Sequence, residues 1–282
     1  MPEAQQPPFE IGPGLLDGLH RLGGYERRIP VSIDRYYENL LDWEHLPHLH
    51  PTNFGAVQLV ARGRRWWTAL VGTAQEISPT RLTSVVVAED RSAYAVRNAT
   101  ETVFVRLSEL GPREVSAEVS FHSVQEPRNV VARDALLALY RKQFLALSDE
   151  DQAAMVEREE ALARLARRES AVEEGADLGS FAEVAARVPF ITTWRGSRFW
   201  VVRRGEGFAA HAADCPHMLG PVTPMDEACG HEVHCPWHAY RFDAVTGGST
   251  DGRGLQLRRP FGLDVVEGRV LVRSPAAAVA GE

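Results

Sequence analysis

The sequence predicts an α+β protein in which an antiparallel sheet flanked by helices is followed by a smaller all-β domain. Apolar and polar residues alternate in successive segments over 53–124, as in strands that bury one face of a sheet. Helical spacing of apolar residues appears before this region and again after it, over 131–147. Beyond Phe181 the chain consists of short strand-like segments separated by glycine turns. The length of 282 residues gives each of two domains enough chain for a core.

The composition indicates which kinds of binding partner and which cellular compartment the protein is expected to have. Hydrophobic content of 44% and charged content of 24% are ordinary for a globular protein. The 38 acidic residues outnumber the 31 basic ones, and the net charge of −7 argues against nucleic acid or an anionic membrane as a partner. The chain does not open on a basic stretch followed by an apolar one, and no later run approaches the roughly 18 apolar residues of a membrane helix. We therefore expect a cytoplasmic protein, and three cysteines fit a reducing compartment.

The N-terminal region is expected to contain one strand and one interrupted helix. Residues 1–27 are rich in proline and glycine and are expected to form an irregular extension. A strand is expected over 27–33, and Asp34 is expected to cap a helix that begins at Arg35. Pro47 breaks that helix, because its ring removes a backbone N–H and clashes with a carbonyl in the preceding turn.

The end of this helix carries a cluster of potential metal ligands. Asp42, His45 and His50 have the spacing Asp-x-x-His-x-x-x-x-His. On a straight helix the two histidines would point about 140° apart, so one metal ion could bind both only if the helix is broken at Pro47. His48 is a further candidate ligand, although we favour an exposed loop position for it.

The strands and the following helix are expected to enclose an apolar cavity. Inward-facing residues on the strands are candidates to line it, although each one taken alone is more often part of an ordinary core. They are Trp66, Trp67, Val85, Val87, Phe104 and Phe121. After the helical segment 131–147, a second and more highly charged helical segment is expected over 148–174, and Ser148 with Asp151 fits a capping box at its start.

The expected domain boundaries follow from these patterns. The Gly175-Ala-Asp-Leu-Gly179 stretch has the composition of a linker. We expect an N-terminal extension over 1–27, a first domain over 28–175, a linker over 176–182, a second domain over 183–275 and a tail over 276–282.

The second domain carries two short Cys/His pairs, Cys215-x-His217 and Cys235-x-x-His238. Two thiolates and two imidazoles suit a [2Fe–2S] cluster with cysteines on one iron and histidines on the other. The same four residues also suit tetrahedral zinc, but zinc signatures seldom use this order of spacings. Cys229 lies near the second pair and is interpreted as a free thiol.

The loop sequences CPH and CPWH, followed by Tyr240-Arg241-Phe242-Asp243 and Thr246-Gly247, resemble those of Rieske proteins. The cysteine pair that forms a disulfide in mitochondrial-type Rieske proteins is missing, so the oxygenase or ferredoxin type of cluster is expected. Met218 departs from the pattern, since the family usually has a basic residue there. In the first domain, Glu38-Asn39 followed by the Asp/His cluster resembles the mononuclear-iron motif of the Rieske non-haem iron oxygenases. The order of strands and helices is similar to the helix-grip fold of START-like domains.

The resemblance implies two iron centres and an order of domains opposite to that usual in the family. The cluster would be held by Cys215, His217, Cys235 and His238, and the mononuclear iron by His45, His50 and a carboxylate. Asp151, from the Glu150-Asp151 pair, is the implied carboxylate, with Asp149 as the second candidate. Asp42 would link His238 to His45 for electron transfer.

The function implied is that of a terminal oxygenase component that hydroxylates or oxidatively demethylates a small organic substrate with O₂. Its implied partners are an NAD(P)H-dependent reductase, acting directly or through a ferredoxin, and further copies of the chain in a homotrimer. An alternative is a non-catalytic Rieske electron carrier or redox sensor with a ligand-binding helix-grip domain, and a third is a regulatory subunit of a larger oxygenase. The sequence does not choose the substrate, mono- or dioxygenation, or the cluster potential.

Overall fold

The structure is a computed structural model that describes residues 6–73, 79–168, 170–226 and 230–274. It divides into two compact units, residues 1–156 and 157–282. Cys229 and the expected tail over 276–282 lie outside the described residues. Within the described ranges, none of the helices combines the length and the apolar character that crossing a membrane requires.

The first unit is built on one seven-stranded antiparallel sheet with the strand order β1-β7-β6-β5-β4-β3-β2. Its strands are β1 (His20–Ile29), β2 (Ala56–Gly63), β3 (Trp66–Gly72), β4 (Arg81–Val87), β5 (Ala93–Arg97), β6 (Glu101–Gly111) and β7 (Glu114–Ser123). β1 therefore begins at His20, within the segment expected to be irregular, because residues from His20 to Ile29 pair with β7 from Ser123 to Val115. Backbone pairing with β7 makes this segment a strand, and the amino-acid composition of the segment does not indicate that pairing.

Four helical segments accompany the sheet: α1 (Ile33–Leu41), the 3₁₀ turn η1 (Trp43–His45), α2 (Leu46–Leu49) and α3 (Val130–Arg167). Ser32 caps α1 instead of Asp34, since its hydroxyl accepts from the backbone N–H of Arg35 at 3.4 Å. Asp34 lies in the first turn and pairs with Arg91 at 2.9 Å.

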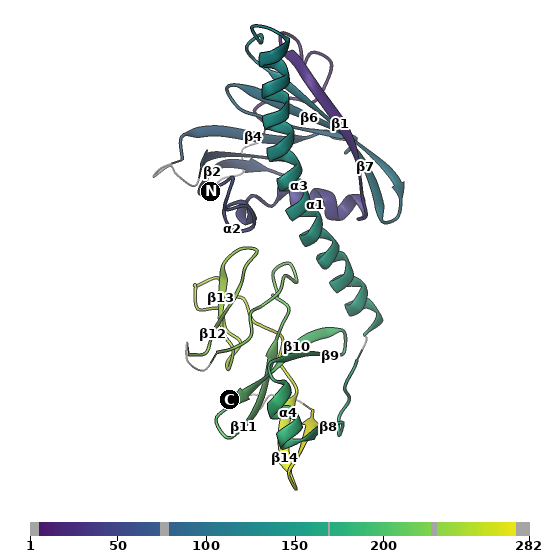
Figure 1. Cartoon of the computed structure of the whole chain (residues 1–282), viewed down its shortest axis with the longest axis vertical. Coiled ribbons are helices and arrows are strands. Elements are labelled where there is room, and N and C mark those ends of the chain that lie inside the picture. The colour runs from purple at the N-terminus through teal and green to yellow at the C-terminus, as the bar shows by residue number, and fades with distance from the viewer. Residues whose placement is uncertain (1–5, 74–78, 169, 227–229, 275–282) are drawn as a thin grey trace. The chain divides into compact units, whose positions relative to one another are not determined.

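Helix α3 is one continuous helix of 38 residues where two segments were expected. The Ser148 hydroxyl donates to the carbonyl of Phe144 at 2.7 Å, so Ser148 lies in mid-helix and the expected capping box at Ser148 and Asp151 is wrong. The first part of α3 packs against the sheet (Figure 1), where Phe144 meets Phe121 with ring centroids 5.9 Å apart. This packing encloses the main core of the unit.

The second unit contains three small sheets, ordered β11-β10-β9, β12-β13 and β14-β15-β8. Their strands are β8 (Asp177–Ser180), β9 (Phe190–Trp194), β10 (Ser197–Arg204), β11 (Gly207–Ala212), β12 (Glu232–Cys235), β13 (Tyr240–Asp243), β14 (Gly262–Val266) and β15 (Arg269–Arg273). The segment after Phe181 is the helix α4 (Phe181–Arg187), where a strand was expected. A capping box explains the difference, because Ser180 and Glu183 satisfy each other's backbone N–H groups. The predicted fold class, α+β with a small all-β second domain, is confirmed.

Candidate metal centres

Three of the residues singled out in the first domain converge. His45, His50 and Asp151 each offer a ligand atom, and these atoms all lie within 4.8 Å of one another. The helix break that allows this comes earlier than expected: α1 ends at Leu41, and Pro47 lies in the first turn of α2. Proline is favoured there because its missing N–H has no partner in a first turn.

The contacts within this triad are close. One Asp151 carboxylate oxygen, Oδ1, lies 3.0 Å from His50 Nε2 and 3.3 Å from His45 Nε2. The two imidazole rings meet edge to face, with centroids 5.3 Å apart. Both histidines are buried, His50 completely. Two imidazole nitrogens and one carboxylate oxygen form the donor set of the 2-His-1-carboxylate iron sites, so these residues fit such an ion.

A carboxylate lies on the far side of each imidazole. Glu150 Oε2 is 2.6 Å from His50 Nδ1, and Asp42 Oδ2 is 3.6 Å from His45 Nδ1. A carboxylate at Nδ1 favours the proton on that nitrogen and leaves Nε2 as the acceptor that can face a metal. The sequence does not predict the contact between Glu150 and His50. The position of Glu150 next to Asp151 is the one feature of the sequence that could have indicated it.

The charges of the triad shift its protonation. Burial lowers the pKa of His45, but the Asp151 and Asp42 carboxylates outweigh it and raise the pKa to about 9. Burial raises the pKa of Asp151, and the two imidazoles lower it more strongly, so that its pKa lies well below the usual range. Without a metal ion, Asp151 is therefore ionised and His45 protonated at neutral pH, so a metal ion that binds the triad would have to displace the proton from His45 Nε2.

The other candidates lie outside the triad. Asp149 is 70% exposed and pairs with Arg27 at 2.8 Å. His48 is exposed. Of the acidic candidates, only Asp151 contributes to the metal-ligand group found among the described residues.

The triad opens onto a cavity of about 380 Å³ between the sheet and α3. Trp67, Val85 and Phe121 line it as expected. Trp66, Val87 and Phe104 do not line it, although they lie on β3, β4 and β6. Trp66 and Phe104 lie on the opposite strand face from Trp67 and Val103, which line the cavity, whereas Val87 shares a face with Val85 but packs in the main core with Val105. The sequence pattern does not give how far along a strand the cavity extends.

The second unit brings the two Cys/His pairs together. Cys215 and Cys235 are both buried, and the Cys235 thiol donates to the Cys215 sulfur, which lowers the pKa of Cys215 and raises that of Cys235. The His217 and His238 rings meet edge to face, with centroids 4.5 Å apart. Two adjacent thiols and two adjacent imidazoles fit a cluster with cysteines on one iron and histidines on the other.

Strand pairing and loop hydrogen bonds hold these ligands. Cys235 ends β12 and pairs with Tyr240 at the start of β13. The backbone N–H of Cys215 donates to the carbonyl of Gly220 at 2.8 Å and closes the first loop. The Tyr240 ring contacts both histidines, with centroid distances of 4.8 Å to His217 and 5.2 Å to His238.

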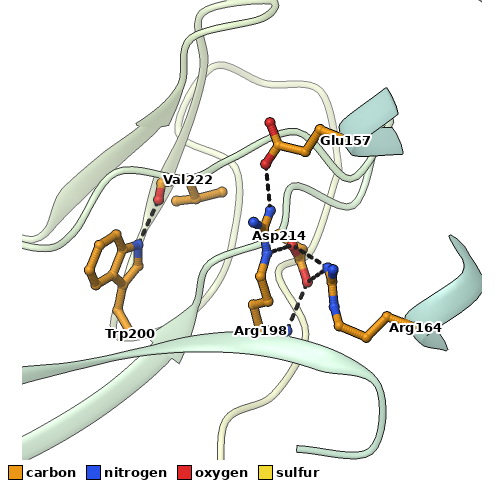
Figure 2. A network of polar contacts seen from close by, with 6 residues as sticks. All are labelled: Glu157, Arg164, Arg198, Trp200, Asp214 and Val222. Carbon is orange, nitrogen blue, oxygen red and sulfur yellow. Dashed lines mark hydrogen bonds and ion pairs between the residues drawn. The ribbon is translucent and has the colours of Figure 1, made fainter. Parts of the chain in front are cut away.

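A buried ionic network anchors the base of the first loop (Figure 2). Asp214, next to Cys215, is only 4% exposed. Its carboxylate accepts from Arg198 Nε at 2.6 Å and from the Arg198 backbone N–H at 2.8 Å, and it lies 3.4 Å from Arg164 of α3. Glu157, also of α3, pairs with Arg198 at 2.9 Å. Sequence reasoning missed this network, because no local motif links these residues.

Comparison with known proteins identifies the second unit. Residues 176–256 match the Rieske [2Fe-2S] domain family. A ferredoxin of carbazole 1,9a-dioxygenase from Nocardioides aromaticivorans IC177 is 24% identical with a TM-score of 0.30, over 36% of this chain and 99% of that one. No curated protein matches the sequence.

Two further solved structures are similar to this chain over about half of its length. The ZhuI aromatase/cyclase from Streptomyces sp. R1128 is 14% identical with a TM-score of 0.41, over 50% of this chain and 95% of that one. Dicamba monooxygenase bound to dicamba is 13% identical with a TM-score of 0.41, over 56% of each chain. The expected Rieske domain and its place after the helix-grip domain are confirmed. The chain is thus a two-domain protein in which a helix-grip domain is followed by a Rieske [2Fe–2S] domain at residues 176–256.

Proposed function

We propose that the chain is the terminal oxygenase component of a Rieske non-haem iron system. The observation that carries this proposal is the triad of His45, His50 and Asp151, whose ligand atoms lie within 4.8 Å at the wall of a cavity. An electron carrier needs neither a mononuclear site nor a cavity beside it. When bound, the cluster supplies electrons, and iron in the triad supplies activation of O₂ for hydroxylation or oxidative demethylation.

The protein residues have separate tasks in this proposal. Cys215, His217, Cys235 and His238 hold the cluster, and the triad holds the mononuclear iron. Glu150 and Asp42 orient the two imidazoles, since each carboxylate lies on an Nδ1 side. Asp42 is also the proposed electron-transfer bridge between His45 and the Rieske histidine His238. The cavity holds the substrate and limits the access of water.

The proposal also includes partners that the resemblance suggests. A reductase that uses NAD(P)H would supply electrons, directly or through a ferredoxin. A head-to-tail homotrimer would bring the cluster of one copy to the iron of another.

Iron and acid-labile sulfide per chain test the proposal. We expect three irons and two sulfides per chain in protein isolated anaerobically with iron supplied, because the cluster contributes two irons and the triad one. The double variant His45→Ala, His50→Ala is expected to hold two irons and two sulfides and to keep the visible absorbance of the cluster.

His48→Ala is the matched control, since His48 is an exposed histidine of the same segment. It should keep the third iron. Two irons and two sulfides in the parent protein would instead support a Rieske electron carrier joined to a ligand-binding domain.

A further inference from the structure

The cavity of the first unit is elongated along α3. The residues of α3 that line it recur at helical spacing and form one face of the helix: Tyr140, Gln143, Phe144, Leu147, Ser148, Asp151 and Met155. From Tyr140 to Asp151 the helix rises about 16 Å at 1.5 Å per residue. Tyr140 and the triad therefore lie near opposite ends of the cavity.

Residues on the strands also show that the cavity is elongated, with the triad at one end. Tyr94 lies at the triad end, because its hydroxyl is 2.9 Å from that of Tyr36 and the charge of Asp151 acts on both phenols. Asn98, just beyond the other end of β5, lines the cavity as well and lies about 13 Å farther along the strand direction at 3.3 Å per residue. Between the two ends most of the lining is apolar, from Val85, Val96, Val103, Phe121 and Phe144, and Gln143 and Ser148 of α3 add polar groups.

The end remote from the triad contains a fixed carboxylate. The side-chain amide of Asn98 donates to Glu101 Oε1 at 3.0 Å, and the Tyr140 hydroxyl donates to the same carboxylate. Burial, the charge of Glu101 and this hydrogen bond raise the pKa of Tyr140 to about 12, against the opposing charge of Arg81. Two donors therefore hold Glu101 in place.

The hydrogen-bonding groups left over at this end include a strong acceptor, Glu101, and donors from Arg81 and the second amide N–H of Asn98. The Tyr140 hydroxyl and one amide N–H of Asn98 are committed to Glu101, and the side-chain oxygen of Asn98 accepts from the backbone N–H groups of Thr100 and Glu101. A carboxylate accepts about four hydrogen bonds, so Glu101 retains capacity toward the cavity. Arg81 lines the same end and offsets the negative charge of Glu101, so a neutral hydroxyl, which can donate to Glu101 and also accept a hydrogen bond, fits better than an ion of either sign.

We propose that the cavity binds an elongated, largely apolar molecule with a hydroxyl group at the end remote from the triad, and that this hydroxyl donates to Glu101. The apolar body lies along Val96, Val103 and Phe144, and the opposite end reaches the triad. That this molecule is the substrate rests on the proposed function, whereas its binding does not.

Equilibrium dialysis of three probes against the full chain tests the inference. The probes are 4-hexylphenol, hexylbenzene and 4-hexylbenzoate, which share the apolar body and differ at one end. We expect the phenol to bind at least about tenfold more tightly than hexylbenzene, because a hydrogen bond to a charged acceptor is lost with the hydroxyl. In Glu101→Gln this preference should fall to about threefold or less, since the acceptor is then neutral.

Glu109→Gln is the matched control, because Glu109 is an exposed carboxylate on the same strand, β6. It should keep the full preference for the phenol. Circular dichroism and the cluster absorbance check that each variant is folded. If Glu101→Gln does not fold, the comparison of the three probes on the parent protein still decides the matter.

Two results would overturn the inference. Equal affinity for 4-hexylphenol and hexylbenzene would mean that Glu101 does not face the ligand. Tightest binding of 4-hexylbenzoate, abolished by Arg81→Gln, would make this end an anion site. The probes need no mononuclear iron, so the phenol preference should persist in the His45→Ala, His50→Ala variant. Failure of the proposed function would appear in the iron count and failure of this inference in the probe preference.

Discussion

His211 is a buried histidine near the first cluster loop whose two ring nitrogens are both used. Nδ1 donates to the carbonyl of Ala212 at 3.0 Å, and Nε2 accepts the backbone N–H of Met225 at 3.0 Å. Burial lowers the pKa of His211 below its ordinary value of 6.5, and the hydrogen bond to Ala212 opposes this only in part. Protonation of His211 at Nε2 would leave the backbone N–H of Met225 without its hydrogen-bond acceptor.

This geometry predicts a pH dependence of stability. Because the folded-state pKa is lowered, the contribution of His211 is fully present above pH 6.5 and is lost as the pH falls from 6.5 through the folded-state pKa. The melting temperature should therefore fall more steeply between pH 7.5 and 5.5 in the parent protein than in His211→Gln. Scanning calorimetry at one scan rate measures both slopes, and equal slopes would contradict the prediction.

Asp214 provides a second prediction at the scale of single residues. Removing its carboxylate takes the anion from Arg164 and leaves Arg198 with Glu157 alone, and breaking a buried pair in this way costs about 3–5 kcal/mol. Asp214→Ala should lower the melting temperature and accelerate the loss of cluster absorbance. Asp264→Ala is the control, because its pair with Arg273 at 3.0 Å is exposed and contributes about 0–1 kcal/mol. Equal changes in melting temperature and in the rate of cluster loss for the two substitutions would show that the buried network stabilises the protein no more than an exposed ion pair does.

The sequence predicted which residues to consider as ligands but not what surrounds them. Spacing singled out His45 and His50, the family resemblance implied Asp151, and these three converge; iron binding by them stays a prediction. The contact of His50 with Glu150 joins residues 100 positions apart, and that of Arg198 with Glu157 joins residues 41 apart. Such contacts depend on tertiary packing, which local spacing does not encode.

Among the elements, the turn between β9 and β10 packs closely against the end of α3. Gly196 in this turn has φ of +85°, and a Cβ there would lie 2.8 Å from the carbonyl oxygen of Arg164 and 2.8 Å from Cα of Leu165. Backbone atoms cannot move aside as a flexible side chain can. Any larger residue must therefore separate the turn from the helix.

Gly196→Ala is expected to destabilise the protein by clearly more than Gly252→Ala. Both glycines have positive φ, but a Cβ at Gly252 meets nothing within 4 Å. Gly252→Ala should therefore cost only the conformational term, about 1–2 kcal/mol. Denaturant or thermal unfolding of both variants separates this term from the clash, and equal losses would show that α3 does not constrain the turn.

Element types were easier to predict than element limits. The long helix and the strands over 53–124 had clear periodicity, and both are present. The sequence predicts two helices in place of α3 because Ser148 and Asp151 imitate a capping box, whereas α3 is continuous from Val130 to Arg167. Helix α4 was missed despite a true capping box, because its seven residues are too short for a periodic signal.

At the scale of the whole molecule, the division into two compact units falls within α3, between Val156 and Glu157. The expected linker at 176–182 lies further along the chain, where composition changes but the helix has already ended. Asp151 and the two network residues Glu157 and Arg164 are thus parts of one continuous helix. The amino-acid composition indicates the irregular segment that follows α3, whereas the division between the two units is determined by which residues contact one another.

Fragments of the chain can test this assignment. A fragment that begins at Asp177 contains nearly all of the Rieske family match but lacks Glu157 and Arg164. It should melt at a lower temperature and lose cluster absorbance faster than one that begins at Ala153. Replacing Glu157 by Gln and Arg164 by Met in the longer fragment should reproduce the behaviour of the shorter one. Equal stability of the two fragments would show that the helix end is dispensable.

The shared helix also bears on how such a protein could arise by gene fusion. A Rieske coding segment joined in at residue 176 would arrive without two of the ion pairs that now anchor Asp214 and Arg198. The last turns of α3 would have had to acquire those charges afterwards, or to travel with the domain. A transferred segment that keeps these ion pairs must therefore be longer than the family match and must begin inside the helix that also carries Asp151.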